Sequence, residues 1–310
     1  MYPLPDGKRY YPFSAHLKEH FGEKIYKVSL DGGFTCPNRD GSLGFSGCTF
    51  CSQDGSLAPG ADPFIGIPEQ IKKGKEFLNK RYGAKKFLAY FQSFSNTYDK
   101  VEILEKKYRL AVSQPDIVGL SISTRPDCVP NETLDLIHDI SKKHYTWLEL
   151  GLQTMHDNIN QSLNRLHKFS DFVDAVERAH SRNLRICGHI ILYLPGETED
   201  HMRQTVKALG NMPLSGIKIH LLHIIKKTAL ASQYAKGEIP LPSQEEYVQT
   251  VCNLVEMLPP KLIIHRLTGE TSREEMIAPK WALNKNLVLK QINDELISRN
   301  SYQGKYFKNF

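Results

Sequence analysis

The sequence predicts an α/β fold in which a parallel sheet forms an open or partial (βα)6 barrel, with a short N-terminal arm and a basic C-terminal extension. From about residue 85, short β-rich apolar runs alternate with segments of helical spacing. Strand–helix alternation is typical of right-handed βαβ units and a parallel sheet. Six such units in 310 residues are too few for an eight-stranded barrel. We expect the functional site at the carboxyl ends of the strands.

The predicted strands are short runs rich in residues that favour extended structure. The first strand is expected at residues 24–30. The later strands are expected at 87–92, 117–123, 147–153, 185–194, 216–222 and 262–266.

Helices are predicted between the strands from apolar spacing and from capping residues. Asn131, Ser170 and Thr198 each precede a segment whose apolar residues recur at helical intervals. Ser243 and Glu246 form a capping box before another such segment. These signals place helices in the stretches that separate the strands.

Three regions are predicted along the chain. Residues 1–25 are an irregular arm rich in Tyr, Phe and Lys, residues 26–230 form the barrel, and residues 231–310 form a helical extension with one extra strand. The extension ends in a basic tail, which contains six cations and two acidic residues, Asp294 and Glu295. The six are Lys280, Lys285, Lys290, Arg299, Lys305 and Lys308.

Composition excludes several classes of protein. Hydrophobic residues make up 40% of the chain and charged residues 24%, which is too apolar for disorder. No apolar run approaches the roughly 20 residues that span a bilayer, and the start MYPLPDGKRYYPF lacks the apolar segment of a secretory signal. We therefore expect a cytoplasmic protein, in which the six cysteines are thiols or metal ligands. The net charge of +6 weakly favours a polyanionic partner.

The most informative feature is a loop of cysteines and glycines after the first strand. Cys48 and Cys51 are separated by two residues, and eleven residues separate Cys36 from Cys48. The glycines let the backbone turn tightly, and they are Gly32, Gly33, Gly41, Gly44 and Gly47.

Three interpretations of this loop compete. The cysteines are incidental core residues, or they bind structural zinc, or they hold an iron–sulfur cluster. Zinc prefers four ligands in two pairs, and no second CxxC or HxxxH follows. Three thiolates leave one iron of a cluster open to a substrate or cofactor.

Further motifs resemble the radical S-adenosylmethionine (SAM) superfamily. The loop ends in Cys48-Thr49-Phe50-Cys51, a Cys-x-aromatic-Cys pattern, and the long first gap resembles the branch that contains the catalytic subunit of Elongator. Within that branch, the chain is similar to the YtqA/YhcC-like group. The other matching stretches are 119–127, 148–154, 164–167 and 188–198.

The resemblance implies two cofactors, a [4Fe-4S] cluster and SAM, and a set of residues that bind them. Cys36, Cys48 and Cys51 would hold the cluster. Arg165 would bind the SAM carboxylate, and Gln153 its ribose. The remaining implied SAM contacts are Gln92, Ser93, Asn96 and Ser123.

Two residues are catalytic candidates. Glu149 lies in the middle of an apolar strand and shares its alternation with Gln153, so both point the same way. An unpaired Glu in a buried strand is costly, so Glu149 is expected near the substrate or SAM. Cys128 follows a strand end and is the second candidate, whereas Cys187 and Cys252 are expected to pack in the core.

The resemblance also implies a substrate and partners. Relatives in the Elongator-like branch act on the wobble uridine of tRNA, and a group close to this chain converts 5-carboxymethylaminomethyl-(2-thio)uridine to the 5-aminomethyl form. The implied partners are tRNA, through its anticodon region, and a one-electron donor such as flavodoxin or ferredoxin, without a membrane. Residues 72–86 contain seven basic residues and one acidic residue, which suits phosphate contact.

The N-terminal arm adds to this predicted RNA surface. It interleaves basic residues with Tyr10, Tyr11 and Phe13, and aromatic rings suit base stacking. Two alternatives stay open. One is a radical SAM enzyme that acts on a small metabolite or peptide, and the other is a zinc-stabilised RNA-binding protein without catalysis.

Overall fold

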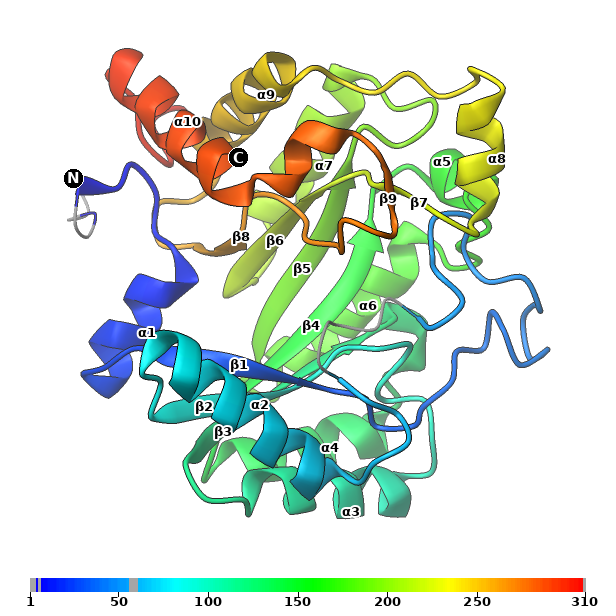
Figure 1. The fold of residues 1–310 in the computed structure, drawn as a ribbon, viewed down its shortest axis with the longest axis vertical. Coiled ribbons are helices and arrows are strands. Elements are labelled where there is room, and N and C mark those ends of the chain that lie inside the picture. The colour runs from blue at the N-terminus through cyan, green and yellow to red at the C-terminus, as the bar shows by residue number, and fades with distance from the viewer. Residues whose placement is uncertain (1–3, 5–6, 56–60, 309–310) are drawn as a thin grey trace.

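A computed structural model describes residues 4, 7–55 and 61–308 of the chain. Within this part, seven strands form one parallel sheet in the order β1-β2-β3-β4-β5-β6-β8, which curls into a half-barrel (Figure 1). The predicted fold class is confirmed. The strands are β1 (Ile25–Leu30), β2 (Lys86–Phe91), β3 (Ile117–Thr124), β4 (Tyr145–Gln153), β5 (Arg185–Leu192), β6 (Gly216–Leu221) and β8 (Ile263–Arg266).

Helices cover the outer face of the sheet. Those that pack on its strands are α2 (Ile67–Tyr82), α3 (Val101–Val112), α4 (Asn131–Ser141) and α6 (Phe169–His180). A second group packs together beyond β6, and it consists of α7 (Glu199–Gly210), α9 (Gln244–Met257) and α10 (Lys285–Ser298). The short helix α5 (Asp157–Ser162) follows β4.

The N-terminal arm differs from the prediction. Residues Phe13–Phe21 form helix α1, which packs on both β1 and β8, the two edge strands of the half-barrel. The backbone N–H of Ile264 donates to the carbonyl of Tyr11 at 2.9 Å, so the chain before α1 also follows β8. The arm therefore closes the open seam of the sheet. Residues 1–3 and 5–6 of the predicted arm lie outside the described part.

Burial explains why the arm is ordered. Tyr10, Tyr11 and Phe13 are 6%, 5% and 8% exposed, so their rings belong to the core and the prediction that they stack on RNA bases is wrong. Figure 1 shows the N-terminal segment beside α10, where the N–H of Arg9 donates to Asn293. The burial of apolar side chains therefore decided the position of the arm, whereas the prediction rested on its pattern of basic and aromatic residues.

The C-terminal tail is an integrated helix rather than a free extension. Val288, Ile292 and Leu296 of α10 are fully buried against the core, and α10 packs on α9. Five of the six predicted tail cations have partners within the protein. Lys285 pairs with Glu270, Lys290 with Asp294 and Arg299 with Glu295. Lys280 donates to the carbonyl of Met276, and Lys305 to that of Asn300.

Some local predictions were confirmed and others were not. Thr198 caps α7, and the Ser243–Glu246 capping box begins α9 as predicted. Asn131 and Ser170 lie inside their helices, which begin after Pro130 and Lys168. The sequence analysis also missed a small antiparallel sheet of β7 (Ile224–Ile225) and β9 (Met276–Ala278), and the helix α8 (Ala229–Ala235). In the described part of the chain, no helix is long and apolar enough to cross a membrane.

Candidate active site

The three loop cysteines line one cavity of about 180 Å³ at the carboxyl ends of the strands. Cys48 is buried, and Cys36 and Cys51 are half-buried; all three are free thiols. Arg39 ties the loop together, because its Nη2 donates to the carbonyl oxygens of Ser52 at 2.6 Å and Cys51 at 3.2 Å. We call this space the cysteine cavity.

A glycine permits the close approach of Arg39 to the loop. Gly47 has a φ of +70°, and a Cβ at this position would lie 2.9 Å from the Nε atom of Arg39. Only glycine adopts this left-handed conformation without strain while leaving room for the guanidinium. The loop glycine therefore has the role that the sequence pattern predicts, which is a tight turn around the cysteines.

The arrangement of the thiols does not match a mononuclear zinc site. Among the residues that the structure describes, no three His, Cys, Asp or Glu side chains are gathered closely enough to hold one metal ion. Structural zinc needs four such ligands around one point. The zinc interpretation therefore lacks a preformed site in this part of the chain.

Arg165 lies directly against the cysteines. Its Nη1 is 3.6 Å from the sulfur of Cys48, its Nη2 donates to the carbonyl of Gly151 at 2.7 Å, and its Nε donates to Nε2 of His167 at 2.8 Å. Burial, together with the charge of Arg165, lowers the pKa of His167 to about 2, so the imidazole is a neutral acceptor. Arg165 lies in the connection between α5 and α6.

The end of β4 is shaped to admit these side chains. A Cβ on Gly151 would lie 2.9 Å from both Arg165 Nη2 and Gln153 Nε2. Gln153 adopts a φ of +76°, and the β4–β5 register shifts between Gly151 and Gln153. Such strain in a non-glycine residue is typical of functional sites.

The other predicted SAM contacts divide into two groups. Gln92, Ser123 and Gln153 line the cysteine cavity. Ser93 and Asn96 are buried beside the cavity but do not line it. Asn96 instead donates through Nδ2 to the carbonyl of Ser123 at 2.7 Å, so it supports the end of β3.

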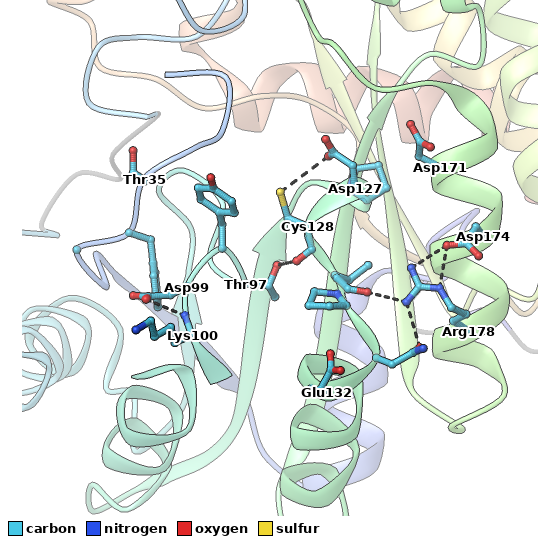
Figure 2. A pocket seen from close by; sticks show the side chains of 17 residues that line it. Thr35, Thr97, Asp99, Lys100, Asp127, Cys128, Glu132, Asp171, Asp174 and Arg178 are labelled. Atoms are coloured by element: carbon cyan, nitrogen blue, oxygen red, sulfur yellow. Dashed lines mark hydrogen bonds and ion pairs between the residues drawn. The ribbon is translucent and has the colours of Figure 1, made fainter. Parts of the chain in front are cut away.

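Cys128 lies in a different cavity from the three loop cysteines. It lines an open groove of about 1210 Å³ together with Thr97 and Asp127, and Figure 2 shows its thiol directed toward Asp127. Burial raises the pKa of this thiol to about 12, so it remains protonated at neutral pH. Cys128 therefore lines this groove and not the cysteine cavity.

The charges of this groove do not suit a nucleic acid. Five carboxylates and two cations, Lys100 and Arg178, line the groove, and Figure 2 shows the two cations far apart in it. The carboxylates are Asp99, Asp127, Glu132, Asp171 and Asp174. Phosphate groups would be repelled here.

Glu149 is fully buried in the middle of the half-barrel. Its two carboxylate oxygens contact the ammonium groups of Lys27 on β1 and Lys218 on β6, and His189 Nε2 lies 2.8 Å away. Burial alone would raise the pKa of Glu149, but Lys218 and Lys27 hold it well below its usual range. Glu149 is therefore an ionised residue that positions two lysines.

Sequence reasoning missed both of these lysines. Each lies in the middle of an apolar strand, in IYKVSL of β1 and GIKIHL of β6. The signal that singled out Glu149, a charge within a buried strand, applies equally to them. A charged residue in the middle of an apolar strand indicates that an opposite charge lies nearby on another strand, because a buried charge without a partner is unstable.

Lys27 and Lys218 line a second, inner cavity of about 520 Å³. We call it the inner cavity, and it lies under α1 between β1 and β8, with Phe13 and His265 on its wall. Eight residues line both cavities, so the two spaces are adjacent. These shared residues are Phe50, Tyr90, Gln92, Gln153, His189, Lys218, His220 and Arg266.

The histidines of the inner cavity are uncharged. Burial lowers the pKa of His189 and of His223 to about 4. It also places the pKa values of His220 and His265 well below their usual range. The fixed charges of this cavity therefore come from lysine, arginine and carboxylate groups alone.

The cysteine cavity has donors that suit an anionic cluster and a ligand carboxylate. Arg125 is 2% exposed, and its Nη1 has no hydrogen-bond partner among the described residues, although the same guanidinium pairs with Asp127. Ser95 Oγ, on the same wall, also has no partner in the part of the chain that the structure describes. Buried polar groups without partners are rare and indicate a missing ligand. Three thiols, two guanidinium groups and these donors fit the cofactors that the resemblance implies.

Comparison with known families agrees with this geometry. A family model described as the Radical SAM superfamily matches residues 36–209, and a model described as the Radical_SAM C-terminal domain matches residues 214–298. The first match begins at Cys36, and together the two matches span most of the half-barrel and α10.

Related proteins match over nearly the whole chain. Uncharacterized protein YtqA of Bacillus subtilis (strain 168) is 44% identical, over 97% of this chain and 94% of its own length. Protein YhcC of Escherichia coli (strain K12) is 38% identical, over 94% of this chain and 93% of its own length. Elongator complex protein 3 of Saccharomyces cerevisiae (strain ATCC 204508 / S288c) is 25% identical, over 66% of this chain and 34% of its length.

Solved structures share the fold. An archaeal Methanocaldococcus infernus Elp3 superposes with a TM-score of 0.67 at 15% identity, covering 90% of this chain and 64% of that chain. A methylornithine synthase, PylB, superposes with a TM-score of 0.54 at 12% identity, covering 92% of this chain and 85% of that chain. At these identities, the likeness concerns the arrangement of strands and helices.

Proposed function

This chain belongs to the radical SAM superfamily, and we propose that it converts 5-carboxymethylaminomethyl-(2-thio)uridine at the wobble position of tRNA to the 5-aminomethyl form. The cofactors of the family are a [4Fe-4S] cluster and SAM, which when bound supply a 5′-deoxyadenosyl radical. The observation that carries the proposal is that the cysteine cavity and the inner cavity share part of their walls. A substrate group in the inner cavity would lie next to the cofactors.

The proposed residue roles follow from the walls of the cysteine cavity. Cys36, Cys48 and Cys51 hold the cluster. Arg165 pairs with the SAM carboxylate, because its guanidinium is fixed by Gly151 and His167 beside Cys48. Gln153 and Ser123 serve the ribose hydroxyls, and Gln92 serves the ammonium group.

The net reaction balances without an oxidant beyond SAM. A hydrogen atom leaves the methylene of the carboxymethyl group for the 5′-deoxyadenosyl radical, and the second electron would return to the oxidised cluster. Water then adds to that carbon, the carbon–nitrogen bond breaks, and the fragment departs as glyoxylate. SAM is reduced overall to 5′-deoxyadenosine and methionine, so a donor such as flavodoxin or ferredoxin would be needed only to reduce the cluster initially.

A basic helix supports an RNA substrate. On α2 and the segment after it, Lys73, Lys80, Arg81 and Lys85 are exposed, and no salt bridge engages them in the described part of the chain. Phe77 and Tyr82 are 59% and 51% exposed, and the Arg81 guanidinium lies over both rings. Exposed cations beside aromatic rings suit phosphate contact and base stacking.

The similarity to proteins named Elongator complex protein 3 further supports tRNA as the substrate, because the chain resembles the branch whose members act on wobble uridine. The proposal places the reaction in the cytoplasm, where tRNA and a reduced one-electron donor are both present. It also places the anticodon region of the tRNA over the mouth of the inner cavity.

Mass spectrometry of tRNA nucleosides from a deletion strain tests the proposal. We expect 5-carboxymethylaminomethyl-(2-thio)uridine to accumulate and the 5-aminomethyl form to disappear, and complementation with the wild-type gene to restore it. Complementation with a Cys48→Ala variant is the matched control and should fail. An unchanged wobble-uridine profile would reject tRNA as the substrate and favour a small metabolite or peptide.

A further inference from the structure

Two cations and one buried anion form the floor of the inner cavity. The Lys27 and Lys218 ammonium groups contact opposite oxygens of Glu149, and the Glu149 side chain is 0% exposed. Lys218 is 4% exposed, whereas the Lys27 side chain is 21% exposed and its ammonium group lies over the rings of Phe13 and Tyr90. Because two ammonium groups face one carboxylate, the floor has one positive charge in excess of its carboxylate. Burying such a charge is costly unless a ligand neutralises it.

Each ammonium group retains a hydrogen-bond donor. Lys218 Nζ donates to Glu149 and to Tyr90 Oη at 3.1 Å, and Lys27 Nζ donates to Glu149 and to Ser121 Oγ at 3.2 Å. An ammonium group has three N–H donors. Within the described part of the chain, one N–H of each lysine therefore has no acceptor. Both lysines line the inner cavity.

A buried histidine beside the floor makes no hydrogen bond within the described part of the chain, and its Nδ1 lies 3.9 Å from Glu149 Oε1. The His265 ring stacks on Phe13 with centroids 3.9 Å apart and contacts Trp147 edge-on at 4.3 Å. Its side chain is 1% exposed, and neither ring nitrogen makes a hydrogen bond. As a neutral imidazole, His265 offers one further donor to a group in the inner cavity.

The other charged residues of the inner cavity do not neutralise the floor. Arg266 faces Glu270 at 3.3 Å, and Glu270 also pairs with Lys285. Asp54 and Glu275 also line the cavity but are exposed to solvent. The buried end of the cavity is therefore positive, and the exposed residues supply its negative charges.

We propose that this floor is a carboxylate-recognition site, in which Lys27 and Lys218 bind the carboxylate of the substrate. The inference rests on the proposed function, because a 5-carboxymethylaminomethyl group ends in a carboxylate. A single excess positive charge with two free ammonium donors matches a monoanion with two oxygens. Since Lys218 lines both cavities, a carboxylate held there places the adjacent methylene toward the cysteine cavity. The product lacks this carboxylate and would leave.

Binding of modified RNA tests the inference separately from catalysis. The probe is an anticodon stem-loop with 5-carboxymethylaminomethyluridine at the wobble position, compared with the same RNA carrying the corresponding carboxamide. Fluorescence anisotropy on the cluster-loaded protein without an electron donor measures affinity alone. We expect the wild-type protein to prefer the carboxylate RNA by about tenfold or more, because charge-assisted hydrogen bonds are lost with the amide.

The Lys218→Met variant tests the contribution of the floor to RNA binding separately from that of the rest of the RNA-binding surface. In this variant, Lys27 still pairs with Glu149, so no buried carboxylate is left unpaired. The preference for carboxylate over carboxamide should fall to about one, while SAM binding and the absorbance of the cluster stay unchanged. Lys27→Met should behave in the same way. The exposed Lys73→Met variant is the control, and it should weaken the binding of both RNAs equally.

The outcomes separate this inference from the proposed function. If the wild-type protein does not distinguish carboxylate from carboxamide, or if Lys218→Met retains the preference, the inference is wrong even where the enzyme converts the RNA. If the preference exists but no conversion follows in the reduced enzyme, the carboxylate site stands and the proposed reaction fails. If the free nucleoside binds as tightly as the stem-loop, the carboxylate site stands and the substrate is a small molecule. The comparison of the two RNAs on wild-type protein stays decisive even if the lysine variants fold poorly.

Discussion

At the scale of single residues, the sequence identified the groups that chemistry makes conspicuous. Cys36, Cys48 and Cys51 were predicted from their spacing in a glycine-rich loop, and they line one cavity. Glu149 was noticed as a charge in an apolar strand, but Lys27 and Lys218, which neutralise it, were not. Strand spacing does not reveal which strands face each other across a barrel, so partners on β1 and β6 were not evident.

Removal of the Glu149 carboxylate should destabilise the protein strongly. Glu149→Ala leaves two buried ammonium groups facing each other, and breaking a buried ion pair costs about 3–5 kcal/mol of folding free energy. Thermal melting of the cluster-loaded protein should show a fall in Tm of several degrees. Glu177→Ala, on the exposed face of α6, is the control and should change the free energy of unfolding by less than about 0.5 kcal/mol. Equal melting of both variants would refute the structural role of Glu149.

Substitution of different cysteines should have different effects, which depend on where each cysteine lies in the fold. Cys48→Ala should abolish the brown colour and the roughly 400 nm absorbance of the anaerobically purified protein, because two thiols cannot hold the cluster. Cys252→Ala should leave both intact, because Cys252 is buried on α9 and its thiol contacts the carbonyl of Ile292. Iron content per chain is the measurement. A colourless wild-type protein with stoichiometric zinc would overturn the assignment.

At the scale of elements, the spacing of apolar residues located the strands of the sheet, but it did not predict the helix that closes the open seam of the half-barrel. The predicted strands agree with the observed ones within two residues at almost every boundary. Helix α1 was missed, because Phe13 and Leu17 are buried only through contact with strands distant in sequence. The tail was interpreted as a charged surface, but its apolar residues pack on α9. Burial against distant parts of the chain decided the structure of both segments, and local sequence patterns do not reveal such contacts.

The end of β4 offers a test of how the cysteine cavity is built. Gly151→Ala would place a methyl group 2.9 Å from the side chains of Arg165 and Gln153. We expect SAM affinity to fall about tenfold or more, because displacement of a fixed guanidinium weakens its pairing with a carboxylate. Equilibrium dialysis with SAM is the measurement. Gly66→Ala is the matched control, since its nearest neighbour would be 3.8 Å away, and an equal loss there would contradict the account.

At the scale of the whole molecule, the distribution of charge matters more than its total. The cations of the tail are mostly paired, whereas four cations of α2 and the segment after it are open to solvent. The groove around Cys128 is lined mainly by carboxylates. Composition could not separate these regions, because pairing depends on residues brought together by folding.

The two basic regions should therefore differ in their contribution to tRNA binding. Replacing Lys73, Lys80, Arg81 and Lys85 with alanine should weaken binding and reduce its salt dependence, because each lost phosphate contact lowers the slope by about one. Replacing Lys285 and Lys290 should have little effect on binding, since both are paired within the protein. Filter binding of tRNA across salt concentrations measures this. A larger change of slope for the tail variant would contradict the assignment.

The central claim is that the cysteine cavity and the inner cavity act together on the carboxymethyl group of wobble uridine. It is tested most directly by reacting the reduced, cluster-loaded protein and SAM with tRNA deuterated at the methylene of that group. The account predicts deuterium in the 5′-deoxyadenosine formed, together with the 5-aminomethyl nucleoside in the tRNA. Formation of 5′-deoxyadenosine without deuterium, and with the nucleoside unchanged, would contradict it.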